Sequence, residues 1–164
     1  MAVKTVADLF VHELSDTYSA EKQMTKSLPK MARAASDEAL SQAFLDHLVE
    51  TRGQVERIDQ VVELLNLKLK RIKCAAMEGL VEEGKDLIDE IDKGPVLDVA
   101  LIGAAQKVEH YEIASYTTLI TLATKLGYTA AVPLLQASLD EEKATDEKLG
   151  KLGHAAAIET ANDE

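Results

Sequence analysis

A chain of 164 residues, of which 46% are hydrophobic, is long enough for one globular domain and has the composition of neither a disordered nor a membrane protein. Its net charge of −11 disfavours nucleic-acid partners, because the chain as a whole would repel phosphates. The basic segment 68–73 (KLKRIK) is too short to offset this charge and is interpreted as a solvated connection.

The cysteine content and the first residues indicate a cytoplasmic protein. The single cysteine, Cys74, excludes an internal disulfide framework and is typical of a reducing compartment. The opening residues, MAVKTVADLF, carry no secretory signal pattern, and no apolar run reaches the length of a membrane span. We therefore expect a cytoplasmic location and no membrane partner, with Cys74 as a buried structural thiol.

Five helices and no strands are predicted along the chain. Abundant Ala, Leu, Glu and Lys, with three prolines and eight glycines, favour long helices. Thr5, with Asp8 three residues on, caps the first helix, and Ser36 or Asp37 caps the second. The tail after Gly153 is weakly patterned and is predicted to fray. The predicted helices cover residues 5–33, 38–65, 75–92, 96–126 and 130–152.

The lengths of the connections predict the topology. The first and second long helices, and likewise the third and fourth, are joined by short breaks, so each pair is antiparallel. About thirty residues separate the second long helix from the third, far more than an antiparallel turn requires. This long crossover contains the short helix 75–92 and lets the third long helix run parallel to the second. The prediction is an all-α four-helix bundle with one long crossover, forming a single domain over residues 1–164.

Acidic residues interrupt the apolar stripes of the long helices near their midpoints. Glu109 and Glu112 share the buried face of the third long helix. Glu21 and Glu142 each lie seven residues from a leucine on both sides, whereas Glu50 lies on the flank of its stripe. The six acids predicted to point into the bundle are Glu21, Glu50, Glu109, Glu112, Glu142 and Asp146.

Six inward carboxylates require a compensating positive charge. An ionised carboxylate in an apolar interior is costly unless it is paired, protonated or bound to a metal. Six of them from four helices would repel one another unless a cation lay between them. Oxygen-rich ligation suits iron, manganese or magnesium better than zinc or copper. The sequence therefore predicts a central metal site, with buried ion pairs to lysines as the alternative.

Five segments of the chain, in order, carry a family resemblance. The segments are SDTYSAEKQ (Ser15–Gln23), HLVETRGQVERI (His47–Ile58), AMEGLVEEG (Ala76–Gly84), AAQKVEHYEIASY (Ala104–Tyr116) and LDEEKATDEKL (Leu139–Leu149). They resemble the YciE/YciF family of ferritin-like bacterial stress proteins, most of all its YciF members, over nearly the whole chain. The resemblance implies a ferritin-like bundle, a rubrerythrin-like dinuclear site for two iron ions per chain, a homodimer and a link to stress response.

The chain departs from the general di-iron pattern at the histidines. That pattern requires Glu-x-x-His on two helices, but neither Glu50 nor Glu142 is followed by a histidine at this spacing. Gln54 and Asp146 are the nearest substitutes, and His47 lies one turn before Glu50. An all-oxygen site would bind iron less tightly and favour manganese or magnesium. The predicted metal ligands are Glu21, Glu50, Gln54, Glu109, Glu112, Glu142 and Asp146.

Two functions from different classes fit this sequence. The first is a cytoplasmic stress-response protein whose metal site carries out iron or peroxide redox chemistry. The second is a non-enzymatic helical dimer that acts through interactions and has no functional metal. An iron store is a third hypothesis, which would require many chains to form a closed shell. The residue pattern assigns no catalytic residue.

Overall fold

The computed structural model describes residues 2–162, with side chains described for residues 2–157. Within this range all secondary structure is helical. None of the helices in residues 2–162 is long and apolar enough to cross a membrane. The five helices are α1 (Val6–Ala34), α2 (Glu38–Leu64), α3 (Ala75–Glu90), α4 (Pro95–Leu126) and α5 (Val132–Asn162).

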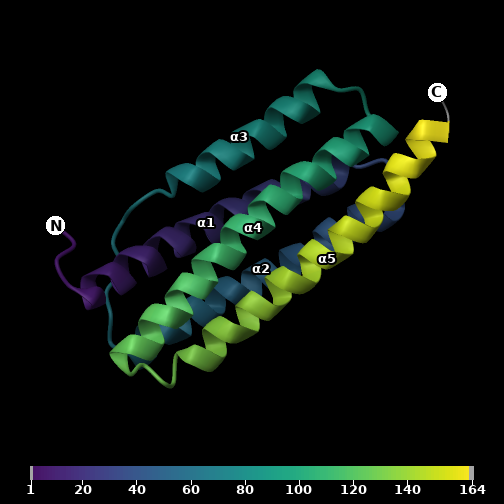
Figure 1. Cartoon of the computed structure of the whole chain (residues 1–164). Helices are drawn as coiled ribbons and strands as arrows, with labels where there is room; N and C mark the ends of the chain where they lie inside the picture. The colour runs from purple at the N-terminus through teal and green to yellow at the C-terminus, as the bar shows by residue number, and fades with distance from the viewer. Residues whose placement is uncertain (1, 163–164) are drawn as a thin grey trace.

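Four long helices enclose the interior and the short helix lies outside them. α1 packs against α2 and α4, and α5 packs against the same two helices, so these four contacts close a ring. α3 lies against α1 and α4 on the outer side (Figure 1). Figure 1 also shows α2 and α4 running in the same direction, as the long connection between them predicts.

The helix ends follow the predicted caps. Thr5 Oγ1 accepts a hydrogen bond from the backbone N–H of Asp8, and the Asp8 carboxylate accepts one from the backbone N–H of Thr5, so the capping box is confirmed. Asp37 caps α2 by accepting from the backbone N–H of Leu40. α4 ends at Gly127, which has a φ of 72°, a left-handed conformation that glycine adopts without steric cost.

The C-terminal end of the chain differs from the prediction. Instead of fraying after Gly153, α5 continues to Asn162. Leu152 packs against the buried core, and Gly153 lies so close to Ile102 that an added Cβ would be 3.0 Å from the Ile102 side chain. The alanines at 155–157 are strong helix formers. Contact with α4 and local helix propensity together extend the helix where hydrophobic periodicity is weak.

The buried interior consists of two apolar clusters, one toward each end of the long helices. The first cluster includes Met24, Leu28, Leu40, Phe44, Leu101, Val108 and Leu149. The second cluster includes Phe10, Leu14, Ile58, Val61, Tyr116, Leu119 and Leu135. Each long helix carries buried polar residues close to the point where it passes from one cluster to the other, among them Glu21, Thr51, Glu112 and Glu142. The candidate site is this polar layer.

Candidate metal centre

The centre of the polar layer is a buried group of one histidine and three glutamates. His47 comes from α2, Glu109 and Glu112 come from α4, and Glu142 comes from α5. One ligand atom from each of the four residues lies within 4.8 Å of those of the others. The spacing of Glu109 and Glu112 places both carboxylates on one face of α4. Three helices thus direct metal-ligating atoms to a common point.

The fourth long helix contributes Glu21. This fully buried residue of α1 accepts a hydrogen bond of 2.5 Å at its Oε1 from the hydroxyl of Tyr116 on α4. Tyr116 lies about one turn after Glu112 on the buried face of α4, so this hydrogen bond places Glu21 beside the same group. The second oxygen of the Glu21 carboxylate has no hydrogen-bond partner. All four long helices therefore supply polar side chains to the layer.

His47 is held so that one ring nitrogen faces the glutamates. Its Nδ1 lies 3.1 Å from Glu50 Oε2 and 3.2 Å from Thr145 Oγ1. Its Nε2 lies 3.0 Å from Glu109 Oε1 and 3.6 Å from Glu142 Oε2. A carboxylate that holds the far nitrogen of a histidine is the usual support for a metal-ligating imidazole. Glu50 gives His47 that support.

Several buried polar atoms of this layer have no hydrogen-bond partner. Buried side-chain oxygens and nitrogens are hydrogen-bonded in most cases, and each exception requires an explanation. His47 Nε2 is within ion-pair distance of Glu109 but does not have hydrogen-bond geometry toward it. The atoms without a partner are Glu21 Oε2, His47 Nε2, Gln54 Oε1, Glu109 Oε2, both carboxylate oxygens of Glu112 and both of Glu142. These donor atoms converge without satisfying one another, which fits a bound cation, and the group could hold a metal.

The pKa values of the carboxyls reflect their confinement. Burial raises the pKa of Glu112 well above its ordinary value, and the charges of Glu21 and Glu109 raise it further. Burial, followed by the charge of Glu112, raises the pKa of Glu142 well above its ordinary value. The pKa of Glu21 rises to about 7, mainly through burial and against the opposing effect of the Tyr116 hydrogen bond.

The pKa of His47 is also raised. Burial alone would lower the pKa of His47, but the charge of the nearby Glu109, followed by the hydrogen bond of Glu50, raises it well above its ordinary value. In return, the His47 hydrogen bond lowers the pKa of Glu50. Without a metal, the cluster therefore holds protons that a bound cation would displace.

The metal-free protein should lose stability as the pH rises from about 5 to about 9. Folding raises the pKa of Glu21 from 4.5 to about 7. The stability that Glu21 contributes is therefore fully present below pH 4.5 and is lost as the pH rises through about 7. The raised pKa values of Glu112, Glu142 and His47 act with the same sign. The change from Glu21 alone is about 3 kcal/mol. Thermal midpoints of chelator-treated protein across this range check the slope, and a steady rise with pH would contradict it.

Removing the Tyr116 hydroxyl should destabilise the protein. The variant Tyr116→Phe leaves the Glu21 carboxyl buried without its donor, and we expect the free energy of unfolding to fall by about 1–3 kcal/mol. The matched control is Tyr128→Phe, because Tyr128 packs by its ring against Phe10. Urea denaturation of both variants measures the difference. Equal losses in the two variants would show that the Tyr116 hydrogen bond contributes nothing specific.

Beside the central group, a clamp joins α2 to α5. Arg57 donates to both oxygens of Glu141, at 2.6 and 2.7 Å, in a bidentate pair. Gln54 donates from Nε2 to the same Glu141 at 3.2 Å, while its Oε1 is buried without a partner. The clamp orients the Gln54 amide and keeps Glu141 directed away from the central group toward Arg57.

The structure brings only some of the predicted ligands together. Glu21, Glu109, Glu112 and Glu142 are buried in the layer. Glu50 lies at its edge with a side chain that is 39% exposed, behind the His47 ring. Asp146 lies apart from the central group.

Asp146 pairs on the outer side of the bundle instead. Its Oδ1 lies 3.3 Å from His110 Nε2 and 3.4 Å from Gln106 Nε2. The buried face of α5 includes Glu142 and Leu149, and the position between them that reaches the layer is Thr145, whose hydroxyl donates to Glu50. Asp146 follows Thr145 and is turned by about 100° from it, so it lies on the opposite flank of the buried face, beside His110 and Gln106 of α4.

His47 is the residue that the list of predicted ligands omits. The inward positions of α2 follow steps of four and three through residues 40, 44, 47, 51, 54, 58 and 61. That spacing places His47 and Gln54 in the interior. The apolar residues Leu48, Val55 and Val62 turn the predicted stripe to one side, which places His47, Glu50 and Gln54 together on its flank. A strict heptad pattern through the polar positions would have found His47.

Within residues 2–162, four long helices around a buried histidine–glutamate layer, with a shorter helix outside them, define an all-α protein with a group able to hold a metal. The chain matches the family described as a domain of unknown function, DUF892, over residues 5–162, and it belongs to that family. Protein YciF of Escherichia coli strain K12 is 64% identical to it over 153 residues, which are 93% of this chain and 92% of YciF.

Solved structures share this fold. The crystal structure of the E. coli stress protein YciF matches with a TM-score of 0.93 and 62% identity, over 95% of this chain and 99% of that one. YcfI of Rhodopseudomonas palustris, provisionally described as a structural protein, matches with a TM-score of 0.87 and 46% identity, over 90% and 94%. A protein of Xanthomonas campestris pv. campestris matches with a TM-score of 0.76 at 22% identity, over 97% and 98%, which shows the common fold alone.

Proposed function

We propose that this protein acts in a bacterial stress response as a ferritin-like four-helix bundle with a dinuclear metal site at its centre. The observation that carries the proposal is the set of buried donor atoms that converge without partners. The E. coli relative that shares most of its length is described as a stress protein. The proposed ligands are Glu21, His47, Glu109, Glu112 and Glu142.

The donor chemistry favours iron, with manganese or magnesium as alternatives. His47 adds an imidazole nitrogen to the carboxylate oxygens, and this mixed set suits iron better than oxygen alone. Glu109 and Glu112, on one face of α4, would both be ligands of the proposed centre. Gln54 offers a further buried oxygen beside them. Glu50 holds the His47 ring from behind and does not need to bind the metal itself.

The chemistry that a bound dinuclear iron centre would provide is the oxidation of ferrous iron by oxygen or peroxide. Three features of the chain suit this oxidation chemistry: the buried glutamates, the Tyr116 hydroxyl and the two apolar clusters. The buried glutamates have raised pKa values and release protons as they become ligands. Tyr116 keeps the Glu21 carboxyl oriented by its hydrogen bond. The apolar clusters on both sides restrict water around the layer.

Metal content tests this proposal directly. Protein purified without chelator, and then supplied with Fe(II) or Mn(II) under anaerobic conditions, should contain about two ions per chain. Elemental analysis after desalting gives the ratio, and anomalous scattering at the iron and manganese edges identifies the ligands. Less than about one ion per two chains after loading would contradict the proposal.

The alternative is a structural or interaction protein with no functional metal. The provisional description of YcfI, which is 46% identical, favours this second candidate. Under it, the chain takes up no metal after loading, and the acid layer serves only the architecture. Stress tolerance of cells that carry a Glu109→Gln plus Glu142→Gln protein separates the two. Full tolerance supports the structural candidate, and lost tolerance with normal protein levels supports the metal site.

We also propose that the protein is a cytoplasmic homodimer. Leu45 and Val49 lie four residues apart on α2, and they are 41% and 68% exposed. An apolar pair on an outer helix face suits contact with a second copy. Sedimentation equilibrium should give about twice the chain mass of 17.8 kDa. A shell of many chains would support iron storage instead, and a monomer would contradict both.

A further inference from the structure

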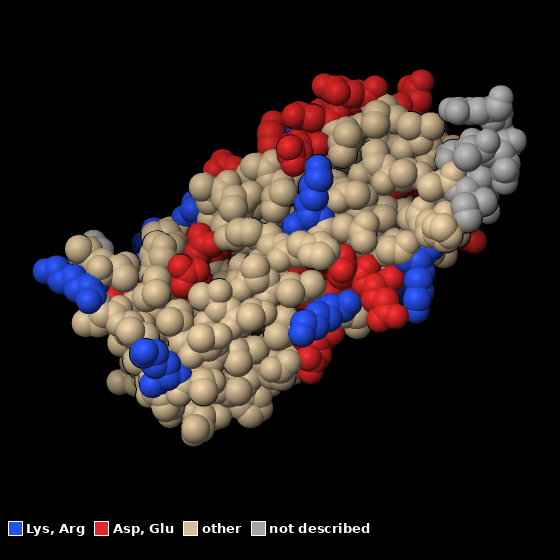
Figure 2. Space-filling view, viewed as in Figure 1, with Lys and Arg blue, Asp and Glu red and all other residues tan. Residues whose placement is uncertain are grey.

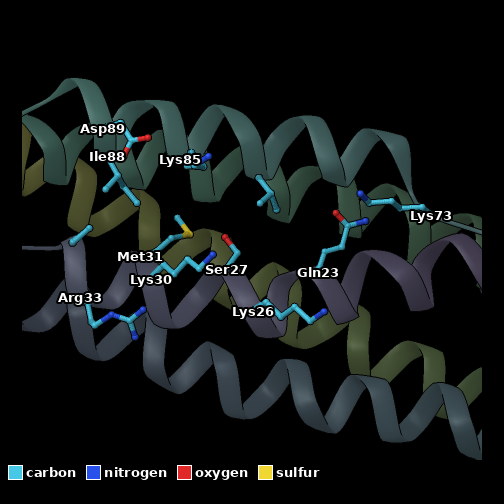
Figure 3. A pocket seen from close by; sticks show the side chains of 13 residues that line it. Gln23, Lys26, Ser27, Lys30, Met31, Arg33, Lys73, Lys85, Ile88 and Asp89 are labelled. Atoms are coloured by element: carbon cyan, nitrogen blue, oxygen red, sulfur yellow. The ribbon is translucent and has the colours of Figure 1, made fainter.

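A groove runs between α1 and α3, on the side of the molecule away from α5. It has a volume of about 700 Å³, which is within the range of small-molecule sites. Figure 3 shows its walls: Lys26, Lys30 and Arg33 rise from α1, and Lys85 and Ile88 come from α3. α3 contributes no residue to the metal centre, so the groove is a separate feature.

The walls of the groove are basic. Lys26, Lys30 and Arg33 recur at four- and three-residue steps on α1, so their side chains share one rim, and Lys85 faces them from α3. No ion pair within residues 2–157 involves these four side chains. Lys73, at one end, is the exception because it pairs with Glu78 at 2.6 Å. Four cationic side chains therefore border one groove without an internal counter-ion.

This charge is unusual for the molecule that carries it. The chain has a net charge of −11, and acidic side chains gather on the outer face above α3 in Figure 2. Within the groove, Asp89 is the one acid among the lining residues. Repulsion from the rest of the surface weakens large polyanions more than it weakens a small anion that fits between the rims. The charge pattern selects a compact anionic ligand.

The floor of the groove is aliphatic. Met31, Val81 and Ile88 line it together with Ala34. Gly84, which is buried in the middle of α3, leaves space, because a Cβ added there would meet nothing within 4 Å. A glycine inside a helix is less favourable than alanine, and here it keeps the floor open. An extended hydrocarbon chain fits such a floor.

The lining also excludes other anions. No aromatic side chain lines the groove, so a nucleobase would find no stacking surface there. A short anion such as phosphate would leave the aliphatic floor unused. We propose that the groove between α1 and α3 binds a free aliphatic carboxylate of the fatty-acid class. Its hydrocarbon chain lies on Met31, Val81 and Ile88, and its carboxylate lies among Lys26, Lys30 and Lys85.

Matched probes test both halves of the ligand. Decanoate, kept below its micelle concentration, should bind the full-length protein saturably at one site per chain in isothermal titration. Decanol, which lacks the charge, and acetate, which lacks the chain, should each bind at least about tenfold more weakly. Raising the salt concentration should weaken decanoate binding through screening. Equal binding of decanol and decanoate would overturn the proposal.

Two variants and one control place the ligand in the groove. Lys26→Gln with Lys30→Gln removes charge from the rim and should weaken decanoate binding about tenfold. Gly84→Leu fills the floor without a backbone clash and should abolish saturable binding. The control, Lys107→Gln with Lys143→Gln, removes two exposed lysines outside the groove and should leave binding unchanged. Circular dichroism verifies folding, and unchanged binding in both groove variants would overturn the proposal.

Other occupants of the groove give different results. Vesicles of phosphatidylglycerol test for a lipid surface, and protein that cosediments with them but does not bind decanoate would overturn the proposal. A second copy of the chain is tested by sedimentation of Gly84→Leu. If Gly84→Leu changes the oligomeric state and decanoate does not change the oligomeric state of the parent protein, the groove is a subunit interface and the proposal fails. Metal content is measured in parallel and should be the same in the groove variants.

Discussion

Saturating Mn(II) or Fe(II) should raise the thermal midpoint of the metal-free protein by about 10 °C. A ligand that binds only the folded state at 100 to 1,000 times its Kd stabilises that state by about 3–4 kcal/mol. In a domain of this size, each kcal/mol moves the midpoint by about 2–4 °C. The effect is large here because a bound cation gives partners to buried oxygen and nitrogen atoms that have none in the metal-free fold. Differential scanning calorimetry with and without metal measures it.

The rise should disappear in the double variant Glu109→Gln plus Glu142→Gln. Both amides keep the shape of the side chain but remove two anionic ligands, so metal should shift the midpoint by less than about 2 °C. The metal-free double variant should be as stable as the parent or more so, because like charges have been removed from the interior. The matched control is Glu82→Gln plus Glu83→Gln on the exposed face of α3, which should keep the full rise. A full rise in the central double variant would refute the assigned site.

Replacing His47 should cause the largest loss of stability in the metal-free protein. His47 is the cationic side chain at the centre of the layer and lies within 3.6 Å of both Glu109 and Glu142. The variant His47→Gln leaves these acids without an opposing charge, and breaking a buried pair in this way costs about 3–5 kcal/mol. Chemical denaturation in chelator measures the loss. Saturating metal should then narrow the gap to the parent, because a bound cation compensates the same charges.

An exposed histidine serves as the control for His47. His110 pairs with Asp146 on the outer side, and its side chain is 68% exposed. His110→Gln should change the free energy of unfolding by less than about 0.5 kcal/mol. Metal affinity should fall by about tenfold or more in His47→Gln and remain unchanged in His110→Gln. A His47→Gln protein as stable as the parent in chelator would show that the imidazole is not needed to balance the glutamates.

Sequence periodicity predicts the helices and four of the five proposed ligands. α1 and α4 have apolar stripes that are regular on both sides of Glu21, Glu109 and Glu112, so an acid within the stripe is visible as an exception. Glu142 is visible for the same reason, since leucines lie seven residues away in both directions. The long connection also predicts the parallel course of α2 and α4, because chain length limits how helices can be joined.

The remaining ligand, His47, and the outward position of Asp146 depend on the rotation of each helix about its own axis. On α2, valines on one flank and polar residues on the inner face give two similar phases, and only packing against α5 selects the one that buries His47. On α5, Asp146 and Thr145 are adjacent, and a rotation of about 100° decides which of them faces the layer. The extension of α5 to Asn162 likewise depends in part on contact with α4, which adds to the local helix propensity of the alanines at 155–157.

The two apolar clusters, separated by one polar layer, have a consequence for the alignment of the helices along their axes. Aliphatic side chains alone would allow one helix to slide past its neighbours by a turn, about 5.4 Å, with little change in packing. In this protein such a slip would move Glu112 or Glu142 against leucines and methionines of a flanking cluster, and an uncompensated carboxylate would be buried there. The polar layer therefore fixes the axial register of all four long helices.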